Sequence, residues 1–121
     1  MAKKKVEIFQ LQSCLDNYCD LMFESYSMLQ KRGISVVAKN YKKVYCTERP
    51  EDYTLDSAYM EFNLDRPEDF NGHSLSVSDV VVLYSEGKKH CYYVDSIGFV
   101  ELPDFDPLDA YIPTYEEGGQ G

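Results

Sequence analysis

Two turns set between short apolar runs restrict this chain most strongly, because together they predict three consecutive antiparallel strands. The apolar run Val80–Leu83 leads into Ser85–Lys88, whose serine, glycine and charged residues are typical of a tight turn. Cys91–Val94 supplies the return strand of a β-hairpin. Asp95–Gly98 is then a second turn, and Phe99–Leu102 a third strand. The second half of the chain is therefore predicted to be a three-stranded meander.

The segment GHSLSVSDVVVL, at residues 72–83, contains the residue types of a Ser-His-Asp catalytic triad. Serine and aliphatic residues alternate from Ser74 to Ser78, and this alternation predicts a half-buried strand with three hydroxyls on one face. On such a strand His73 and its neighbouring serine point to opposite faces, so base and nucleophile do not meet. We therefore interpret Asp79 as a turn or bulge residue whose carboxylate accepts from backbone amides, and Gly72 as a point of backbone freedom.

The first half of the chain is predicted to form a strand, a helix, a strand and a second helix. Strands are expected at Val6–Leu11 and Tyr41–Glu48. The first helix is expected from a cap at Asp16 or Asn17 to Gly33, although Phe23 and Ser25 interrupt its apolar stripe. The second follows a Thr54 cap, and its apolar residues lie on one face, which is expected to pack on the core: Leu55, Ala58, Tyr59 and Phe62. The expected fold is one α+β domain: strand-helix-strand-helix followed by the three-stranded antiparallel meander.

Charge is distributed unevenly along the 121 residues. The chain carries 21 Asp and Glu against 12 Lys and Arg, a formal net charge of -9, and no lysine or arginine follows Lys89. This disfavours direct binding to nucleic acid, which requires lysine and arginine, but it permits competition with nucleic acid for a basic groove. We expect a domain at residues 4–106 and an acidic, glycine-ending tail at 107–121, mobile from Pro103 onward.

The four cysteines are expected to be thiols of a cytoplasmic protein, because the basic amino terminus is not followed by the apolar segment of a secretory leader. Cys14 and Cys19 are five positions apart, which is not the spacing of a zinc site, and Cys46 and Cys91 are isolated. No apolar run is long enough to cross a bilayer. We therefore expect no metal, no cofactor and no membrane partner.

Two long segments resemble the YodL-like domain family: RPEDFNGHSLSVSDVV at residues 66–81 and YYVDSIGF at residues 92–99. The resemblance covers roughly residues 4–106. Two departures are Ile97, where an aromatic residue is commoner, and the spacing of Ser13–Asp20. Shorter matching segments are KVEIFQL at residues 5–11, Asn40-Tyr41, Leu55-Asp56 and Phe62-Asn63.

The resemblance implies a small accessory domain that acts by contacting another protein. Such domains are widespread in Firmicutes, often on conjugative and other mobile elements, free-standing or as modules of very large polyvalent proteins. The resemblance carries no catalytic residues over to this chain. Its implication is a non-enzymatic role.

Candidate partner-binding residues are aromatic and acidic side chains of the predicted strands and turns. Exposed tyrosine is common where proteins meet, although a small sheet also uses tyrosine for its strand preference. Both explanations stay open. The candidates are Tyr41, Tyr45, Tyr84, Tyr92, Tyr93, Asp95, Phe99, Asp104 and Asp106.

The leading hypothesis is a non-enzymatic protein-binding accessory factor of a bacterial mobile element. In its most specific form it inhibits a host or defence protein, in the manner of anti-restriction or anti-CRISPR proteins, by acidic mimicry of nucleic acid. The expected partner is a bacterial protein, such as a basic nucleic-acid-handling enzyme. Two alternatives are a small hydrolase-like enzyme that uses His73 or His90 as its base, and a structural adaptor domain that self-associates.

Overall fold

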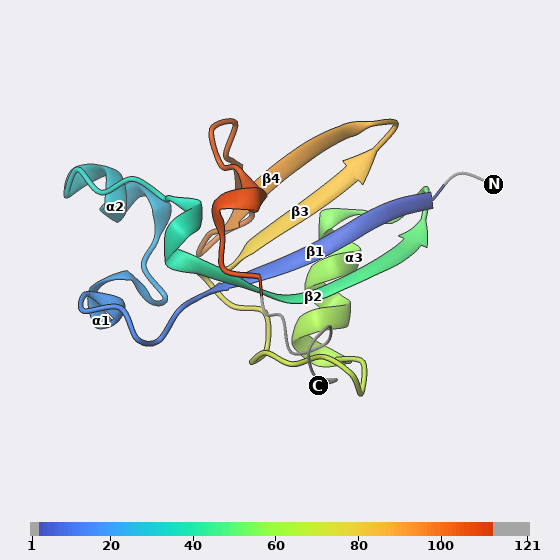
Figure 1. The fold of residues 1–121 in the computed structure, drawn as a ribbon, viewed down its shortest axis with the longest axis horizontal. Helices are drawn as coiled ribbons and strands as arrows, with labels where there is room; N and C mark the ends of the chain where they lie inside the picture. The colour runs from blue at the N-terminus through green and yellow to red at the C-terminus, as the bar shows by residue number, and fades with distance from the viewer. Residues whose placement is uncertain (1–2, 113–121) are drawn as a thin grey trace.

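A five-stranded antiparallel sheet in the order β2-β1-β3-β4-β5 is the centre of the structure, a computed structural model that describes residues 3–112 (Figure 1). The meander of β3, β4 and β5 is confirmed, and β1 pairs with both β2 and β3. The predicted single α+β domain is therefore confirmed. The strands are β1 (Lys3–Leu11), β2 (Tyr41–Pro50), β3 (Val80–Ser85), β4 (Lys88–Val94) and β5 (Phe99–Glu101).

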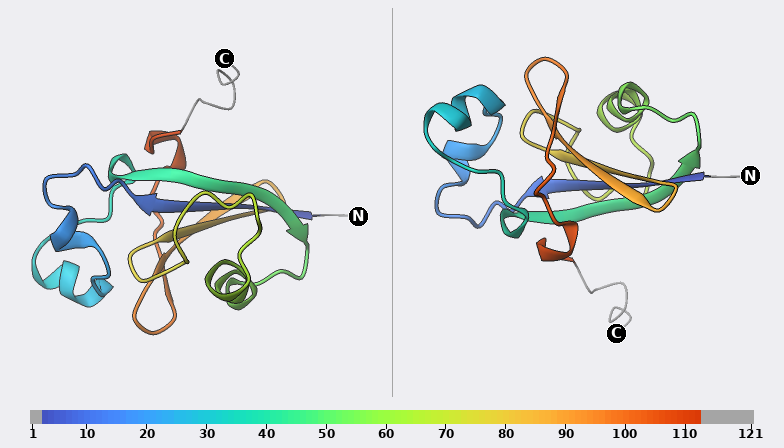
Figure 2. Two further views of the ribbon diagram at one scale, coloured as in Figure 1. Left: turned by 90° about the horizontal axis from the view of Figure 1, so that it is seen from below. Right: turned by 90° about the horizontal axis from the view of Figure 1, so that it is seen from above.

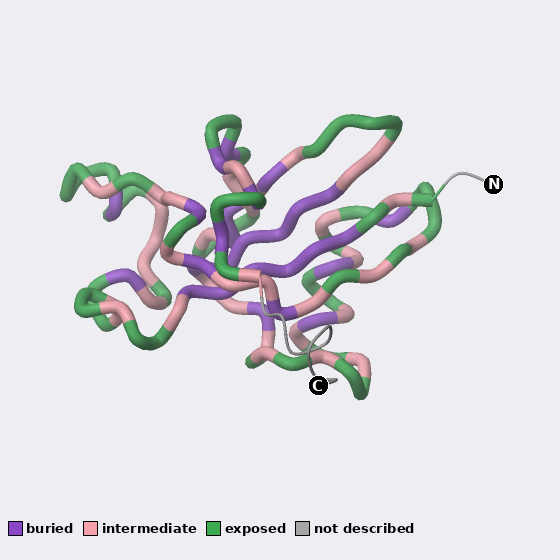
Figure 3. Tube along the Cα trace, in the orientation of Figure 1, coloured by how far each residue is buried: buried purple, intermediate pink, exposed green. Residues whose placement is uncertain are grey.

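Both faces of the sheet are covered, so the two central strands have apolar side chains pointing in both directions. Figure 3 shows β1 and β3 buried along most of their lengths. This explains the unbroken apolar run at the start of β3, since alternation is lost where both faces are dry. The first face carries Phe9, Leu11, Val80, Val82, Cys91 and Tyr93. The second face carries Val6, Ile8, Val81, Leu83 and Val94.

The helix α3 (Leu55–Tyr59) covers the second face and continues as a wider π turn, Met60–Leu64 (Figure 2). Thr54 caps it as predicted, because its hydroxyl accepts from the Ser57 amide at 3.1 Å. Ala58 and Phe62 are fully buried against the sheet, whereas Tyr59 is 41% exposed. The predicted core position of Tyr59 is wrong, since the sheet contacts the face of the helix that carries Ala58 and Phe62.

The single helix predicted up to Gly33 is wrong: two short helices, α1 (Tyr18–Leu21) and α2 (Tyr26–Lys31), lie there instead. The break is at Phe23, whose φ of 61° is incompatible with a continuing right-handed helix. Ser25 restarts the helix by accepting from the Met28 amide at 3.3 Å. Gly33 ends α2 with a φ of 70°, as its position at the carboxyl end predicted.

The segment after β5 packs on the first face of the sheet. The prediction of a mobile tail from Pro103 onward is therefore wrong for residues 103–112. Phe105 is buried and makes edge-on contacts with Phe9 and Tyr41. A 3-10 turn, η3 (Pro107–Asp109), follows, and Tyr111 donates its amide to the Tyr41 carbonyl at 2.9 Å. Residues 113–121, with the rest of the predicted tail, lie outside the described residues.

Residues 72–79 form an irregular anchor loop, not the predicted half-buried strand. Ser78 has a φ of 88°, which breaks the alternation, and its side chain is buried instead of sharing an open face with the other serines. Asp79 is 1% exposed, and its Oδ2 accepts from the Ser76 amide at 2.8 Å, as predicted for a backbone-binding carboxylate. The same oxygen accepts from the Gln10 amide group at 3.0 Å, which ties the loop to β1.

Gly72 is needed for close approach and not for turning, which corrects the expected role of this residue. Its φ is not positive, but a Cβ added there would lie 2.2 Å from the Gln10 Oε1 and 3.1 Å from a Val44 methyl carbon. Gln10 uses that Oε1 to accept from the His73 amide at 3.1 Å and donates its own Nε2 to the His73 carbonyl at 2.8 Å. The absent side chain therefore makes room for a buried glutamine.

The buried Asp79 carboxyl predicts a pH dependence of stability. Burial raises the pKa of Asp79 in the folded chain. Its stabilising contribution is therefore complete below the unfolded pKa of about 3.9 and is lost as pH rises through the folded value. We measure the free energy of unfolding by urea denaturation. As the pH rises from 4 to 8, we expect this free energy to fall less in the Asp79→Asn variant than in the original chain.

Two further variants separate this effect from the general acidity of the chain. Asp52→Asn removes an exposed carboxyl and is expected to follow the pH dependence of the original protein. Asp79→Ala leaves the Ser76 and Gln10 donors without their acceptor, which costs about 1–3 kcal/mol at any pH in this range. Identical pH profiles for Asp79→Asn and the original chain would contradict the assignment.

The β3–β4 turn generates a second prediction. Glu86 and Gly87 have φ values of 53° and 78°, the signs of a type I′ turn, in which asparagine is favoured first. We expect Glu86→Asn to raise the free energy of unfolding by about 1 kcal/mol, because the left-handed backbone is less strained with asparagine. Glu86→Gln removes the same charge without that preference and is expected to have no such effect. Equal stabilities of the two variants in thermal denaturation would refute this.

Candidate protein-binding surface

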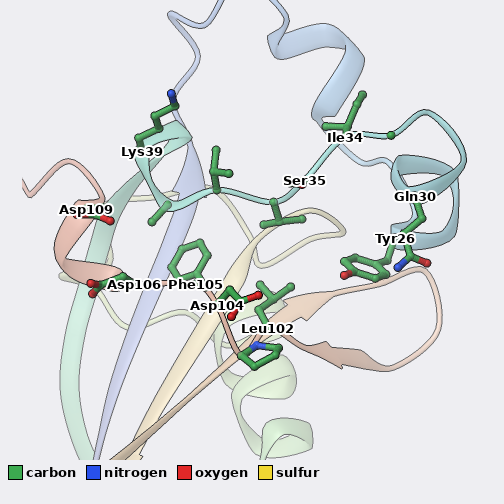
Figure 4. A pocket seen from close by; sticks show the side chains of 15 residues that line it. Tyr26, Gln30, Ile34, Ser35, Lys39, Leu102, Asp104, Phe105, Asp106 and Asp109 are labelled. Atoms are coloured by element: carbon green, nitrogen blue, oxygen red, sulfur yellow. The ribbon is translucent and has the colours of Figure 1, made fainter.

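An acidic cleft of about 860 Å³ lies between the segment that follows α2 and the segment that follows β5 (Figure 4). Its floor includes the aromatic ring of Phe105, and Tyr26 of α2 closes one side. Two of the predicted acidic residues, Asp104 and Asp106, line it together with Asp109. The full lining is Tyr26, Gln30, residues 33–39, residues 102–106 and Asp109.

Two of the three carboxylates in the acidic cleft are uncommitted, in the sense that they form no hydrogen bond or ion pair with a described residue. Asp106 lies 3.6 Å from the Lys89 ammonium and accepts from the Leu108 amide at 3.1 Å. Asp104 and Asp109 are exposed, and neither side chain has a hydrogen bond or ion pair with a described residue. Asp109 is not among the candidates predicted from the sequence, although its position two residues after Pro107 of η3 could have indicated it. The cleft therefore presents free negative charge.

An apolar groove of about 390 Å³ lies on the second face of the sheet, between α3 and the β4–β5 turn. Phe99 and Asp95, both predicted candidates, line it beside Tyr59 and Met60. Met60 is 60% exposed. The complete lining is Asp56, Tyr59, Met60, Val77, Val94, Asp95, Ser96, Gly98 and Phe99. The structure thus separates the acidic candidates Asp104 and Asp106 from the groove candidates.

Two of the tyrosine candidates, Tyr41 and Tyr93, are buried inside the domain. Their exposed fractions are 2% and 1%. The Tyr41 hydroxyl donates to the Ser78 carbonyl at 2.7 Å, and the Tyr93 hydroxyl donates to the Glu24 carbonyl at 2.6 Å. They support the fold and contribute no exposed surface.

The remaining tyrosines are half-buried but do not lie together. The Tyr45 hydroxyl donates to Asp69 at 2.9 Å on the second face, near the β2 edge. Tyr84 donates to the buried Glu7 at 2.9 Å on the first face. Tyr92 lies on the second face of β4, and β1 and β3 separate this strand from β2 and Tyr45. The nine candidates therefore do not form one continuous patch.

Both long sequence motifs converge on the short link between α1 and α2. Ser78 from the first motif accepts from the Phe23 amide through its Oγ at 3.2 Å. From the second motif, Tyr93 binds the Glu24 carbonyl, and Asp95 Oδ1 accepts from the Tyr26 amide at 3.0 Å. Asp95 also accepts from the Ser96 amide at 2.8 Å, the predicted turn-making contact. These motif side chains hold backbone in place.

The residues of the suspected triad do not assemble into one. His73 Nε2 lies 3.9 Å from Asp79, and its Nδ1 donates to the Ser74 carbonyl at 2.8 Å. The Ser76 hydroxyl donates to the same carbonyl, and the Ser78 hydroxyl is occupied by the Phe23 amide. No serine hydroxyl in the described part of the chain contacts a histidine ring, so the nucleophile–base contact of a triad is missing.

The second histidine and the cysteines lie apart from this loop. His90 Nδ1 is 3.4 Å from the exposed Glu101 carboxylate at the β4–β5 pair. Cys91 is buried, which raises the pKa of its thiol to about 11, whereas the other three cysteines are exposed and unpaired. Among residues 3–112 there is no group of three or more His, Cys, Asp or Glu that could hold a metal ion. No helix in this part of the chain is long and apolar enough to span a bilayer.

Comparison with known proteins identifies the family. A family model described as the YodL-like domain matches residues 5–105, from β1 to Phe105 in the segment that follows β5. No curated protein and no solved structure matches the chain. The match covers most of the sequence and includes both motifs that hold the α1–α2 link. This chain belongs to the YodL-like domain family.

Proposed function

We propose that this domain is a non-enzymatic accessory factor of a bacterial mobile element that binds a basic, nucleic-acid-handling protein through its acidic cleft. The observation that supports it best is the pair of uncommitted carboxylates, Asp104 and Asp109, at the cleft. They belong to a chain in which Asp and Glu outnumber Lys and Arg by 21 to 12. A surface of this kind attracts a positively charged groove.

The proposed mode of action is occupation of a groove that otherwise holds nucleic acid. Such a groove is lined by lysine and arginine that neutralise phosphates. Carboxylates held along the acidic cleft offer those cations an alternative partner, and the domain then excludes the nucleic acid sterically. Inhibition of a defence nuclease is the form of this activity that suits a factor of a mobile element.

The proposal includes the absence of catalysis. It is supported by how the conspicuous polar residues are used: Ser76, Ser78 and Asp79 bind backbone groups and a glutamine side chain. These side chains stabilise the anchor loop, and a reaction that moved them would break the hydrogen bonds that hold this loop. A turnover that is lost in both His73→Ala and His90→Ala variants of a folded domain would overturn this part.

The acidic cleft can be tested with a triple variant, Asp104→Asn, Asp106→Asn and Asp109→Asn. We expect the immobilised original domain to retain basic nucleic-acid-binding proteins from a bacterial lysate at low salt. These proteins should be released at 1 M salt, where screening is strong, or by excess duplex DNA. The triple variant should lose them, because asparagine keeps the shape and the Leu108 cap but removes the charge. Quantitative mass spectrometry of the eluates measures the difference.

A matched control changes three exposed carboxyls elsewhere: Asp52→Asn, Asp65→Asn and Glu68→Gln. It reduces the net negative charge by the same amount and is expected to keep the retained proteins. If both triple variants lose them equally, net charge and not the acidic cleft is responsible. Retention that is unchanged between low and high salt would remove the mimicry of nucleic acid and leave protein binding alone.

A further inference from the structure

The strand β5 has a free edge, because it is the last strand of the sheet and pairs only with β4. The Leu102 amide donates to the Cys91 carbonyl at 2.7 Å, and the Asp95 amide donates to the Gly98 carbonyl at 3.0 Å. In an antiparallel pair, hydrogen-bonded and non-hydrogen-bonded residues alternate. Val100 is therefore bonded to β4, whereas the backbone N–H and C=O groups of Phe99 and Glu101 point outward.

These outward groups have no hydrogen-bond partner among the described residues. Edge groups of this kind are a template for an additional strand. Of the two hollows, the apolar groove includes Phe99 of β5 on the second face. The acidic cleft has no residue of β5 in its lining, but it includes Leu102, which follows the strand directly, and Phe105 on the first face. Figure 2 shows the β4–β5 turn projecting between α2 and α3.

The two hollows define the chemistry of an added strand, since its successive side chains point to opposite faces. On the second face, an apolar side chain would contact Tyr59, Met60 and Phe99. On the first face, a lysine or arginine would lie near Asp104. Glu101 pairs with Tyr92 and lies on the second face, and its negative charge opposes pairing with a second copy of the same edge.

The opposite edge of the sheet, formed by β2, is less suited to strand addition at both of its ends. At the start of β2, the Tyr41 carbonyl and the Lys43 amide are already bonded to Tyr111. The far end of β2 carries Glu48, Arg49 and Pro50, and charges and proline discourage strand addition. Arg49 is moreover paired with Glu61 in an ion pair.

We propose that an extended segment of the partner, with apolar and basic side chains in alternation, adds to β5 as a sixth strand. This inference rests on the proposed function, binding of a basic protein, and specifies how that protein docks. Main-chain hydrogen bonds to Phe99 and Glu101 supply the attachment, and the two hollows select the alternating pattern.

A capped synthetic peptide of alternating valine and lysine is the probe. We expect it to bind the full domain in a saturable way and to protect the Phe99 and Glu101 amides from hydrogen exchange, with no change at Val100. A peptide of the same composition with three valines followed by three lysines should bind about tenfold more weakly or worse, because it cannot satisfy both faces. No saturable binding of the alternating peptide would overturn the proposal.

Methylation of the peptide backbone tests the edge without altering the domain. In a strand, all valine amides face one edge and all lysine amides the other. N-methylation of one set should reduce affinity about tenfold or more, and N-methylation of the other set should leave it unchanged. The sensitive set reports the direction of the added strand. Equal effects of both sets would exclude strand addition.

A pair of domain variants completes the test. Glu101→Pro removes the outward amide but no bond to β4, and should weaken peptide binding about tenfold relative to Glu101→Ala, which keeps the amide. Equal binding by the two variants contradicts the proposal. If the peptide fails while salt-sensitive retention of basic proteins persists, the docking mode is wrong and the proposed function stands. Loss of both overturns both.

Discussion

The hydrogen bond between the buried Gln10 and Asp79 side chains is the contact on which the arrangement of this domain depends. It joins the carboxyl-terminal end of β1 to the residue that precedes β3, and it helps to hold the irregular anchor loop against the sheet. Gly72 must lack a side chain for Gln10 to fit. Ser78, in the same loop, has a left-handed backbone with a φ of 88°. Because buried polar groups are costly without partners, this network has one satisfied arrangement and specifies the loop strongly.

That arrangement extends to the α1–α2 link and so to the binding surface. Ser78, Tyr93 and Asp95 each hold one backbone group of residues 23–26. The link places α2 against the β4–β5 turn, and α2 in turn forms one side of the acidic cleft. Residues that resemble catalytic groups in the sequence therefore act on surface shape indirectly. In the function that we propose, recognition is left to the free carboxylates of the acidic cleft and to the backbone of the edge strand β5.

Much of the fold was predictable from local patterns, whereas part of the candidate surface was not. Alternation and turn residues located the strands, and Thr54 marked the start of α3. Alternation also shows which strand residues share a face, but not which face another segment will cover. Tyr41 and Tyr93 were therefore among the candidate partner-binding residues, although the segment containing Phe105 packs over one and the α1–α2 link over the other. Asp104 and Asp106, predicted as partner-binding residues, line the acidic cleft, because charged side chains remain near solvent.

The sequence by itself determined the meander, the alternation of apolar residues on each strand, the excess of negative charge and the family. These are local or additive properties, which depend on neighbouring residues or on composition. Only the tertiary structure decided that Phe23 interrupts a helix, that Asp79 meets Gln10 across 69 positions, and that residues 103–112 fold back on the sheet. Each of these depends on contacts between segments distant in sequence, whose free energy exceeds the local preference of the residues involved.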